Sequence, residues 1–358
     1  MTSQNGSYDR SSNMISDDAV ERINSEENNT EQQLGFSVDQ INVPNKNFRE
    51  YLSEKSASVK KSTIKDYSVS ARHFHEYCDE FLTDDLMKIK PEKIQGFFWH
   101  CVKDQEHREK TVEKRKTVLA GFYEYYQLQK EYDPLISRIH VEKALKPEIL
   151  KLCPEKIERE PISREEYDRL LNNADSALDR LIIQFTYETG GRNDDVRCTK
   201  VRDLSLDDAT VKFRDSKYGI DYVVPLRSEL VIKLRQWIEN GREAYLNGRQ
   251  SEYLFPSEHG PQLQYGDGLR KIVDSAARSA GIQDTIGSIQ PNDGRGTSHM
   301  SRVTPHTLRH SIITHLSNDN VDLKYRQLLA GHSDPTTTEQ IYTHDDDTAF
   351  DILREKIN

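Results

Sequence analysis

Residues 304–310 read T-P-H-T-L-R-H, and this stretch decides how the second half of the chain is interpreted. Thr304 can accept a hydrogen bond from a free backbone N–H and Pro305 suits a first helical turn, so a helix begins here. His306 and Arg309 are three residues apart, which places both side chains on one face of that helix. An imidazole and a guanidinium on one face can together bind a small anion such as a phosphate.

The chain after this stretch predicts two more helices and presents two further side chains. A helix over about 322–330 ends at Gly331, the residue type best able to adopt the left-handed conformation after a helix. His332 comes next and is therefore held at a helix end. The run S-D-P-T-T-T-E-Q-I-Y over 333–342 starts with an N-cap and a proline, which predicts a short helix that presents Tyr342.

Upstream, a helical run ends at T-G-G-R-N-D-D-V, residues 189–196. Gly190 and Gly191 allow a tight backbone bend, so the chain turns there and delivers the side chain of Arg192. Asp195 follows three residues later, where it can orient that arginine or serve as an ordinary salt-bridge partner.

The next segment predicts the β-structure of the chain. Alternating apolar and β-branched residues predict strands over about 203–206, 209–215 and 220–226, with a turn around 216–219 that carries Lys217 at its tip. A flexible ammonium in a turn can reach an oxygen that leaves a phosphate, which is the place of a general acid. The expected fold class is mainly α with a small antiparallel β-sheet (α+β).

In these segments the chain resembles the tyrosine recombinase family, which includes phage integrases and chromosome-dimer resolvases. The resemblance is close over about 160–345 and general for the domain before it. The chain departs from the usual family pattern in three ways. Asp195 stands where many members carry Glu, the gap from His332 to Tyr342 is one residue longer than is frequent, and a Gly/Ser/Asn-rich stretch occupies 286–300. The matching motifs are T-G-G-R at Arg192, the strand-turn lysine Lys217 before V-V-P-L, H-x-x-R at His306 and Arg309, G-H-S at His332, and I-Y-T-H at Tyr342.

The resemblance implies a reaction in which Tyr342 attacks phosphorus, giving a 3′-phosphotyrosine and a free 5′-hydroxyl. Because one ester replaces another, no nucleotide triphosphate is expected. The resemblance also implies a reaction without a metal or other cofactor. Arg192 and Arg309 would hold the non-bridging oxygens in a fork geometry that lysine cannot copy. Lys217 would act as the acid. His332 or His306 would help deprotonate the tyrosine, whose phenol has an ordinary pKa of about 10.

The partners expected from the resemblance are double-stranded DNA, a homotetramer assembled on two DNA sites, and accessory DNA-bending proteins. Integration, excision and dimer resolution stay open. Two other functions also remain: DNA relaxation of the type IB topoisomerase kind, and a catalytically silent DNA-binding regulator. The complete set of catalytic groups argues against the regulator, and sequence-specific binding with pairing of two sites would distinguish a recombinase from a topoisomerase.

The domain organisation follows from composition and helical periodicity. Residues 1–45 hold eight acids and two bases and are expected to be a disordered acidic tail. A helical pattern over 46–140 predicts a small bundle, which resembles the SAM-like core-binding domain of the family. Prolines among mixed charges suggest a linker over 141–161. The catalytic domain is expected over 162–358, opened by a capping box at Ser163 and Glu166.

The net charge of −10 and pI of 5.7 at first oppose DNA binding, but the tail with its eight acids and two bases accounts for −6 of that net charge. Basic residues cluster in two helical runs, and DNA contact and a solvated helix face are equally good interpretations of them. A short amphipathic helix over 349–357 could dock on a neighbouring subunit or on its own. The basic residues are Lys60, Lys61, Lys65 and Arg72 in the first run, and Arg108, Lys110, Lys114, Arg115 and Lys116 in the second.

The four cysteines are scattered without a C-x-x-C motif, so neither a zinc site nor a disulfide framework is expected. No H-E-x-x-H occurs, and His310 and His315 are expected to be packing or surface residues. No signal peptide or membrane-length apolar run is recognisable, and a reducing cytoplasm is the expected location.

Overall fold

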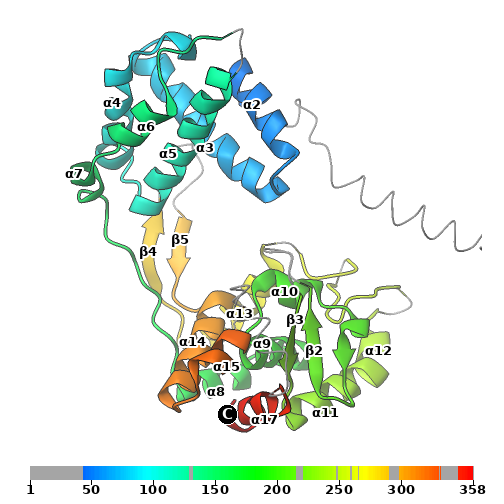
Figure 1. Ribbon diagram of the computed structural model, residues 1–358. Helices are drawn as coiled ribbons and strands as arrows, with labels where there is room; N and C mark the ends of the chain where they lie inside the picture. Colours follow the sequence, from blue (N-terminus) through cyan, green and yellow to red (C-terminus); the bar gives the residue numbers. More distant parts are fainter. Residues whose placement is uncertain are drawn as a thin grey trace, which may run out of the picture. The chain divides into compact units, whose positions relative to one another are not determined.

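A computed structural model describes residues 43–128, 132–214, 221–246, 249–258, 260–264, 266–289, 298–329, 331 and 346–357. The chain forms two compact units, Met1–Lys156 (unit 1) and Ile157–Asn358 (unit 2), each of which is described by itself (Figure 1). The predicted tail lies outside the described residues except for its last three, which belong to unit 1. Val43 is buried and Asn45 caps the first helix, accepting bonds from the N–H groups of Asn47 and Phe48.

Unit 1 is the predicted helical bundle, and aromatic side chains dominate its core. Phe48 and Phe122 pack with ring centroids 4.1 Å apart, and Phe74 meets Phe97 edge to face at 5.0 Å. Such pairs add to the free energy gained by burying apolar area. The elements of unit 1 are α2 (Lys46–Ser56), α3 (Lys61–Phe81), the 3₁₀ turn η2 (Leu86–Lys88), α4 (Pro91–Lys103), α5 (Glu109–Leu128), α6 (Arg138–Ala144) and α7 (Pro147–Leu150).

The predicted linker over 141–161 is wrong in its first half. The side chains of Val141 and Ile149 are fully buried in the core of unit 1, so 141–150 belongs to the bundle. Pro147, which suggested a break, instead occupies the first turn of α7, where its missing N–H removes no helical hydrogen bond. From Lys151 onward the remaining residues of the predicted linker form no helix.

Unit 2 carries the predicted catalytic segments. Its elements are α8 (Arg164–Asn172), α9 (Ala177–Thr189), α10 (Asn193–Cys198), η3 (Val201–Asp203), β1 (Leu204–Ser205), β2 (Thr210–Phe213), β3 (Tyr222–Pro225), α11 (Ser228–Gln236), the π-helical turn η4 (Trp237–Gly241), α12 (Arg242–Leu246), α13 (Gly268–Ser279), β4 (Thr285–Ile289), β5 (Ser298–Ser301), α14 (Pro305–Asn318), α15 (Leu323–Leu329) and α17 (Asp346–Lys356).

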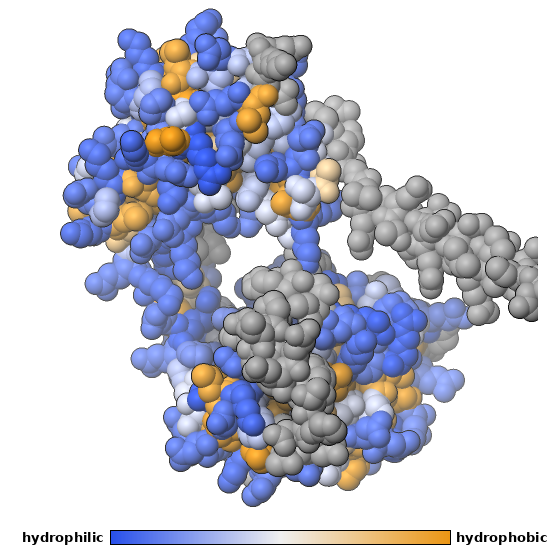
Figure 2. Space-filling model, in the orientation of Figure 1, coloured by the Kyte–Doolittle hydropathy of each residue, from blue (hydrophilic) through white to orange (hydrophobic). Residues whose placement is uncertain are grey.

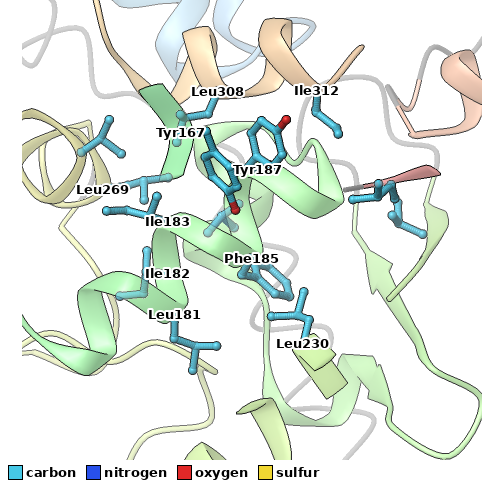
Figure 3. Packing of buried hydrophobic residues seen from close by; sticks show 14 of the residues in the cluster. Tyr167, Leu181, Ile182, Ile183, Phe185, Tyr187, Leu230, Leu269, Leu308 and Ile312 are labelled. Carbon is cyan, nitrogen blue, oxygen red and sulfur yellow. The ribbon is translucent and has the colours of Figure 1, made fainter. Parts of the chain in front are cut away.

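Helix α9 runs through the centre of unit 2 and is buried on every side from Leu181 to its end. Tyr187 on α9 stacks on Tyr167 of α8 with centroids 3.8 Å apart, and the two rings lie together in the middle of the cluster in Figure 3. The capping box predicted at Ser163 and Glu166 is present at the start of α8. A helix packed all round is a rigid support for the residues at its end.

The small antiparallel sheet is confirmed, with strand order β1-β2-β3 and Phe213 opposite Tyr222 in the β2–β3 pair. A second, two-stranded sheet of β4 and β5 falls in the Gly/Ser/Asn-rich stretch, where no strand was predicted. Gly and Ser interrupt the β-forming residues of β4, and β5 consists of Ser, His and Met, so residue propensity does not predict this sheet. A Cβ on Gly287 would lie 2.3 Å from the end of the Ile157 side chain, so a larger residue there would displace that side chain.

The C-terminal helix α17 docks on its own subunit. Leu353 and Ile357 are buried in the core of unit 2, and α17 lies against β3 (red in Figure 1). Arg354 donates to the Asp208 carbonyl at 2.8 Å. Of the two interpretations of this amphipathic segment, packing within one subunit is the one present in this structure.

Polar side chains cover most of the face shown in Figure 2, with apolar patches scattered among them. No described helix is both long enough and apolar enough to cross a membrane.

Candidate active site

Arg192 is delivered by the turn between α9 and α10, as the glycines predict. Gly190 ends α9 with a φ of 59°, a left-handed conformation that favours glycine. A Cβ on Gly191 would lie 2.9 Å from the Val196 side chain and 3.1 Å from Phe213, so a larger residue would push the turn off the core. Arg192 therefore starts α10 from a constrained position and is only partly exposed.

Arg309 reaches the same turn from α14. Thr304 caps this helix by accepting a bond from the Thr307 N–H at 3.2 Å, which confirms the predicted helix start. Arg309 is 5% exposed, and its Nη1 donates to the carbonyl of Gly190. His306, in the first turn of α14, is exposed. The arginine thus points into unit 2 and the histidine lies at its surface.

Gly331 provides a third attachment point in this cluster. It follows α15 with a φ of 49°, as the predicted end of that helix requires. Its carbonyl accepts a hydrogen bond from Nη2 of Arg192 at 2.9 Å. The arginine therefore ties the α9–α10 turn to the chain immediately before His332.

Asp195 supports Arg192 through one carboxylate oxygen. Asp195 is 3% exposed, and its Oδ2 accepts the backbone N–H of Arg192 at 3.0 Å and lies 3.5 Å from Nη1 of the same residue. The hydroxyl of Tyr222 donates to this oxygen at 2.7 Å. This geometry suits the orienting role predicted for Asp195.

Tyr222 is the residue of this cluster that the sequence interpretation missed. The sequence predicts only a strand rich in β-forming residues for the stretch 222–224. Alternation with Val224 is the available signal, because it places Tyr222, whose side chain has a polar tip, on the buried face of β3. Nothing in the local sequence connects that tip to Asp195.

The cluster concentrates positive charge. Burial lowers the pKa of Arg309, and the nearby Arg192 charge lowers it further, while Tyr222 and Asp195 offset part of this effect. Burial, with the Asp195 carboxylate beside it, raises the pKa of Tyr222 above its ordinary value, so the phenol stays protonated. Two guanidiniums and one carboxylate leave an excess of positive charge, which an anion would neutralise.

Lys217, His332 and Tyr342 lie outside the described residues. The structure therefore brings together Arg192, Asp195 and Arg309, and describes the chain that leads to the other predicted residues. The strands β2 and β3 flank the segment with Lys217, and Gly331 directly precedes His332. Within the described ranges, no group of three or more His, Cys, Asp or Glu side chains could hold a metal ion.

The predicted DNA-binding lysines lie on the surface of unit 1. Lys60, Lys61 and Lys65 are exposed at the start of α3, whereas Arg72 is half-buried further along this helix. Lys114 of α5 forms a 2.7 Å salt bridge with Asp66. This bridge joins the N-terminal halves of α3 and α5, so the two basic runs lie on neighbouring helices.

Arg115 contradicts its prediction as a DNA contact. It is 3% exposed, and its guanidinium donates to Sγ of Cys101 at 3.2 Å and to Nε2 of His107 at 3.1 Å. A phosphate cannot approach a side chain enclosed in this way. Its neighbours in sequence suggested a solvated basic face, but position 115 falls on the buried face of α5.

Comparisons with known proteins agree with this fold. The phage integrase family model matches residues 160–349, more than half of the chain. The chain is 30% identical over 247 residues to the tyrosine recombinase XerD of Pseudomonas putida, covering 67% of this chain and 73% of that protein. It is 27% identical over 294 residues to the tyrosine recombinase XerC of Halalkalibacterium halodurans, covering 79% and 86%.

Solved structures show the same fold at low identity. A XerH site-specific recombinase bound to its difH substrate before cleavage aligns with a TM-score of 0.57 at 21% identity, over 92% of this chain and 87% of that one. A lambda integrase tetramer bound to a Holliday junction aligns with a TM-score of 0.57 at 16% identity, over 91% and 84%. Sequence and fold together define a tyrosine-type site-specific recombinase. The chain belongs to the phage integrase family.

Proposed function

We propose that this chain recombines DNA at specific sites by cutting and rejoining strands through a 3′-phosphotyrosine at Tyr342, without metal or nucleotide triphosphate. One observation carries the proposal. Arg192 and Arg309, from distant parts of the sequence, converge on one turn, where Arg309 donates to the Gly190 carbonyl next to the start of α10. Convergent guanidiniums suit the non-bridging oxygens of a phosphodiester.

The proposed steps balance in bonds and protons. The Tyr342 oxygen forms a bond to phosphorus as the bond from phosphorus to the 5′-oxygen breaks. His332 or His306 takes the phenol proton, and Lys217 gives a proton to the departing oxygen. In the return direction a 5′-hydroxyl attacks the phosphotyrosine and releases Tyr342. Loss of one arginine contact to the transition state should cost roughly 3–4 kcal/mol, about 10²–10³ in rate.

The partners in this proposal are double-stranded DNA and further copies of the chain. The exposed lysines Lys60, Lys61 and Lys65 of unit 1 supply phosphate contacts. A homotetramer on two sites is the proposed assembly, supported by the lambda integrase tetramer on a Holliday junction with which the fold aligns. Since α17 docks in cis, an exchange of C-terminal segments would require its release from the core of unit 2.

Trapping of a covalent complex tests the reaction. The protein is incubated with a labelled DNA duplex taken from the region that flanks its gene in the genome. The duplex carries a nick that lets the cleaved fragment diffuse away, and the mixture is then denatured and separated on a gel. We expect a labelled protein band that is lost in Tyr342→Phe while DNA binding persists. EDTA should leave the band unchanged. Sequence-specific binding without an adduct would contradict the proposal and favour a DNA-binding regulator, and relaxation of supercoils without pairing of two sites would favour a topoisomerase.

A further inference from the structure

We propose that Tyr222 is a positioning residue for the arginine pair. Its hydroxyl holds Asp195 in place and its ring packs against Gly331, and these are the two residues to which Arg192 is bound. The expected effect of Tyr222 on DNA cleavage rests on the proposed function. Its structural part concerns only how Arg192 is held toward an anion.

The hydroxyl of Tyr222 controls the orientation of Asp195. It donates to Oδ2 at 2.7 Å, and the same oxygen accepts the Arg192 N–H at 3.0 Å. The other oxygen, Oδ1, is buried and has no hydrogen-bond partner among the described residues. Both hydrogen bonds that orient this carboxylate therefore meet at one atom. Removing the phenol donor leaves this oxygen with only the Arg192 N–H and the 3.5 Å ion pair to Nη1 of the same arginine.

The ring of Tyr222 supports the second anchor of Arg192. A Cβ on Gly331 would lie 2.6–2.8 Å from three atoms of the ring, so the Gly331 backbone rests directly against it. The Gly331 carbonyl in turn accepts Nη2 of Arg192, whose guanidinium carbon lies 5.9 Å from the ring centroid. One side chain thus contacts both groups that hold the guanidinium.

Tyr222 acts here as a neutral donor and a packing surface. It is 7% exposed, and burial together with the Asp195 carboxylate raises its pKa. A phenol that stays protonated and enclosed donates to Asp195 throughout the working pH range. This state also separates its role from that of Tyr342, which must lose its proton to attack.

The test compares two substitutions that remove only a hydroxyl. Tyr222→Phe keeps the ring under Gly331 and deletes the bond to Asp195. Tyr167→Phe is the matched control, because Tyr167 is also 7% exposed, lies in the same core, and has a hydroxyl without a partner among the described residues. Single-turnover cleavage of the nicked duplex should fall about 10- to 100-fold in Tyr222→Phe, since a bond to a charged group is lost. Tyr167→Phe should stay within about two-fold of the unmodified protein.

A change in the substrate distinguishes positioning from general loss of structure. A methylphosphonate at the scissile position removes the charge of one non-bridging oxygen and so lowers the demand on the arginines. The deficit of Tyr222→Phe should then shrink to about three-fold or less, because the lost interaction acts through those arginines. A 5′-thiol leaving group, which needs no acid, should leave the deficit unchanged. A deficit that is equal on the ordinary phosphate and the methylphosphonate would overturn the inference.

A measurement without DNA separates this inference from the proposed function. Inorganic sulfate is titrated into the full chain while the side-chain N–H signal of Arg192 is followed by NMR. Tyr222→Phe should require about ten-fold more sulfate for half-saturation than the unmodified protein or Tyr167→Phe. Equal titrations in all three proteins, or no response in the unmodified protein, would overturn the inference. A missing covalent adduct with normal sulfate titration would instead count against the proposed function alone.

Discussion

Arg115 in unit 1 and Arg309 in unit 2 are buried to a similar degree, with 3% and 5% of their surface exposed. Their neighbours differ. Arg115 donates to the thiol of Cys101 and to the imidazole of His107. Burial, aided by the positive charge of Arg115, lowers the pKa of His107 to about 3 and so keeps this imidazole neutral. Arg309 lies close to a second guanidinium, that of Arg192, and the Asp195 carboxylate offsets part of the positive charge of both.

The difference separates a structural arginine from one prepared for a ligand. The two hydrogen-bond partners of Arg115 are neutral groups, and its own side chain is almost completely closed to solvent. Around Arg309 like charges are held together at a cost in desolvation and repulsion that an arriving anion would relieve. Both arginines occur in basic or helical runs of similar appearance. The residues that surround each side chain, and not the residue type, therefore distinguish the two roles.

The largest expected effect is on cleavage by Arg309→Lys. Lysine cannot form the planar fork, so we expect covalent adduct formation to fall about 10²–10³-fold. DNA affinity should change little, because one guanidinium among many phosphate contacts is altered. Arg115→Lys serves as the control in unit 1 and should leave the cleavage rate of bound DNA unchanged. Equal losses in both variants would show that the two arginines do not differ in role.

The next effect concerns a buried carboxyl in unit 2. Glu188 is 4% exposed, and burial raises its pKa from 4.5 to about 7, although the Gln184 amide and Arg227 oppose the shift. The folded protein therefore binds more protons than the unfolded chain between these values, and its free energy of unfolding falls as pH rises from 4.5 to 7. The loss should approach about 3 kcal/mol.

Glu188→Gln should remove this pH dependence in unit 2. Urea unfolding followed by Trp237 fluorescence in a Trp99→Phe background reports unit 2 alone, since the chain has 2 tryptophans. A pH slope that survives in Glu188→Gln would assign it to another group.

A smaller effect of opposite sign is expected in unit 1. The lowered pKa of His107 means that the folded state binds fewer protons than the unfolded chain below pH 6.5. The free energy of unfolding should therefore fall by about 1–2 kcal/mol from pH 6.5 to pH 5, after allowance for partial solvent screening. His107→Gln should abolish the loss, measured through Trp99 in a Trp237→Phe background. If the free energy of unfolding changed with pH in the same direction in both units, the two units would not differ in their buried titratable groups as they differ in their buried arginines.

The smallest effect is on the salt dependence of DNA binding. Lys65→Ala should reduce the slope of log affinity against log salt by about 0.9, as expected for one lost phosphate contact. Arg115→Met should leave the slope unchanged, because the enclosed guanidinium touches no phosphate. A reduced slope in Arg115→Met would mean that this side chain reaches DNA after all.

Local features of the site were predictable because they depend on near neighbours. Thr304 caps α14, Gly190 bends the chain before Arg192, and Gly331 ends α15 with positive φ, all as the sequence patterns indicate. The β4–β5 hairpin and the helical half of the supposed linker were not predictable in this way. Short strands of mixed β-propensity and short helices that contain proline take their stability from packing against distant segments.

The amino-acid sequence by itself determines the helix starts, the bend before Arg192, the strands beside Lys217 and the resemblance to tyrosine recombinases. These features are local, because caps, glycine conformations and side-chain periodicity act over one or two turns of chain. The meeting of Tyr222 with Asp195, of Arg192 with Gly331, and the enclosure of Arg115 follow from the folded core. These contacts join residues 27, 139 and 14 positions apart, and only the packing of whole helices and strands determines which distant groups become partners.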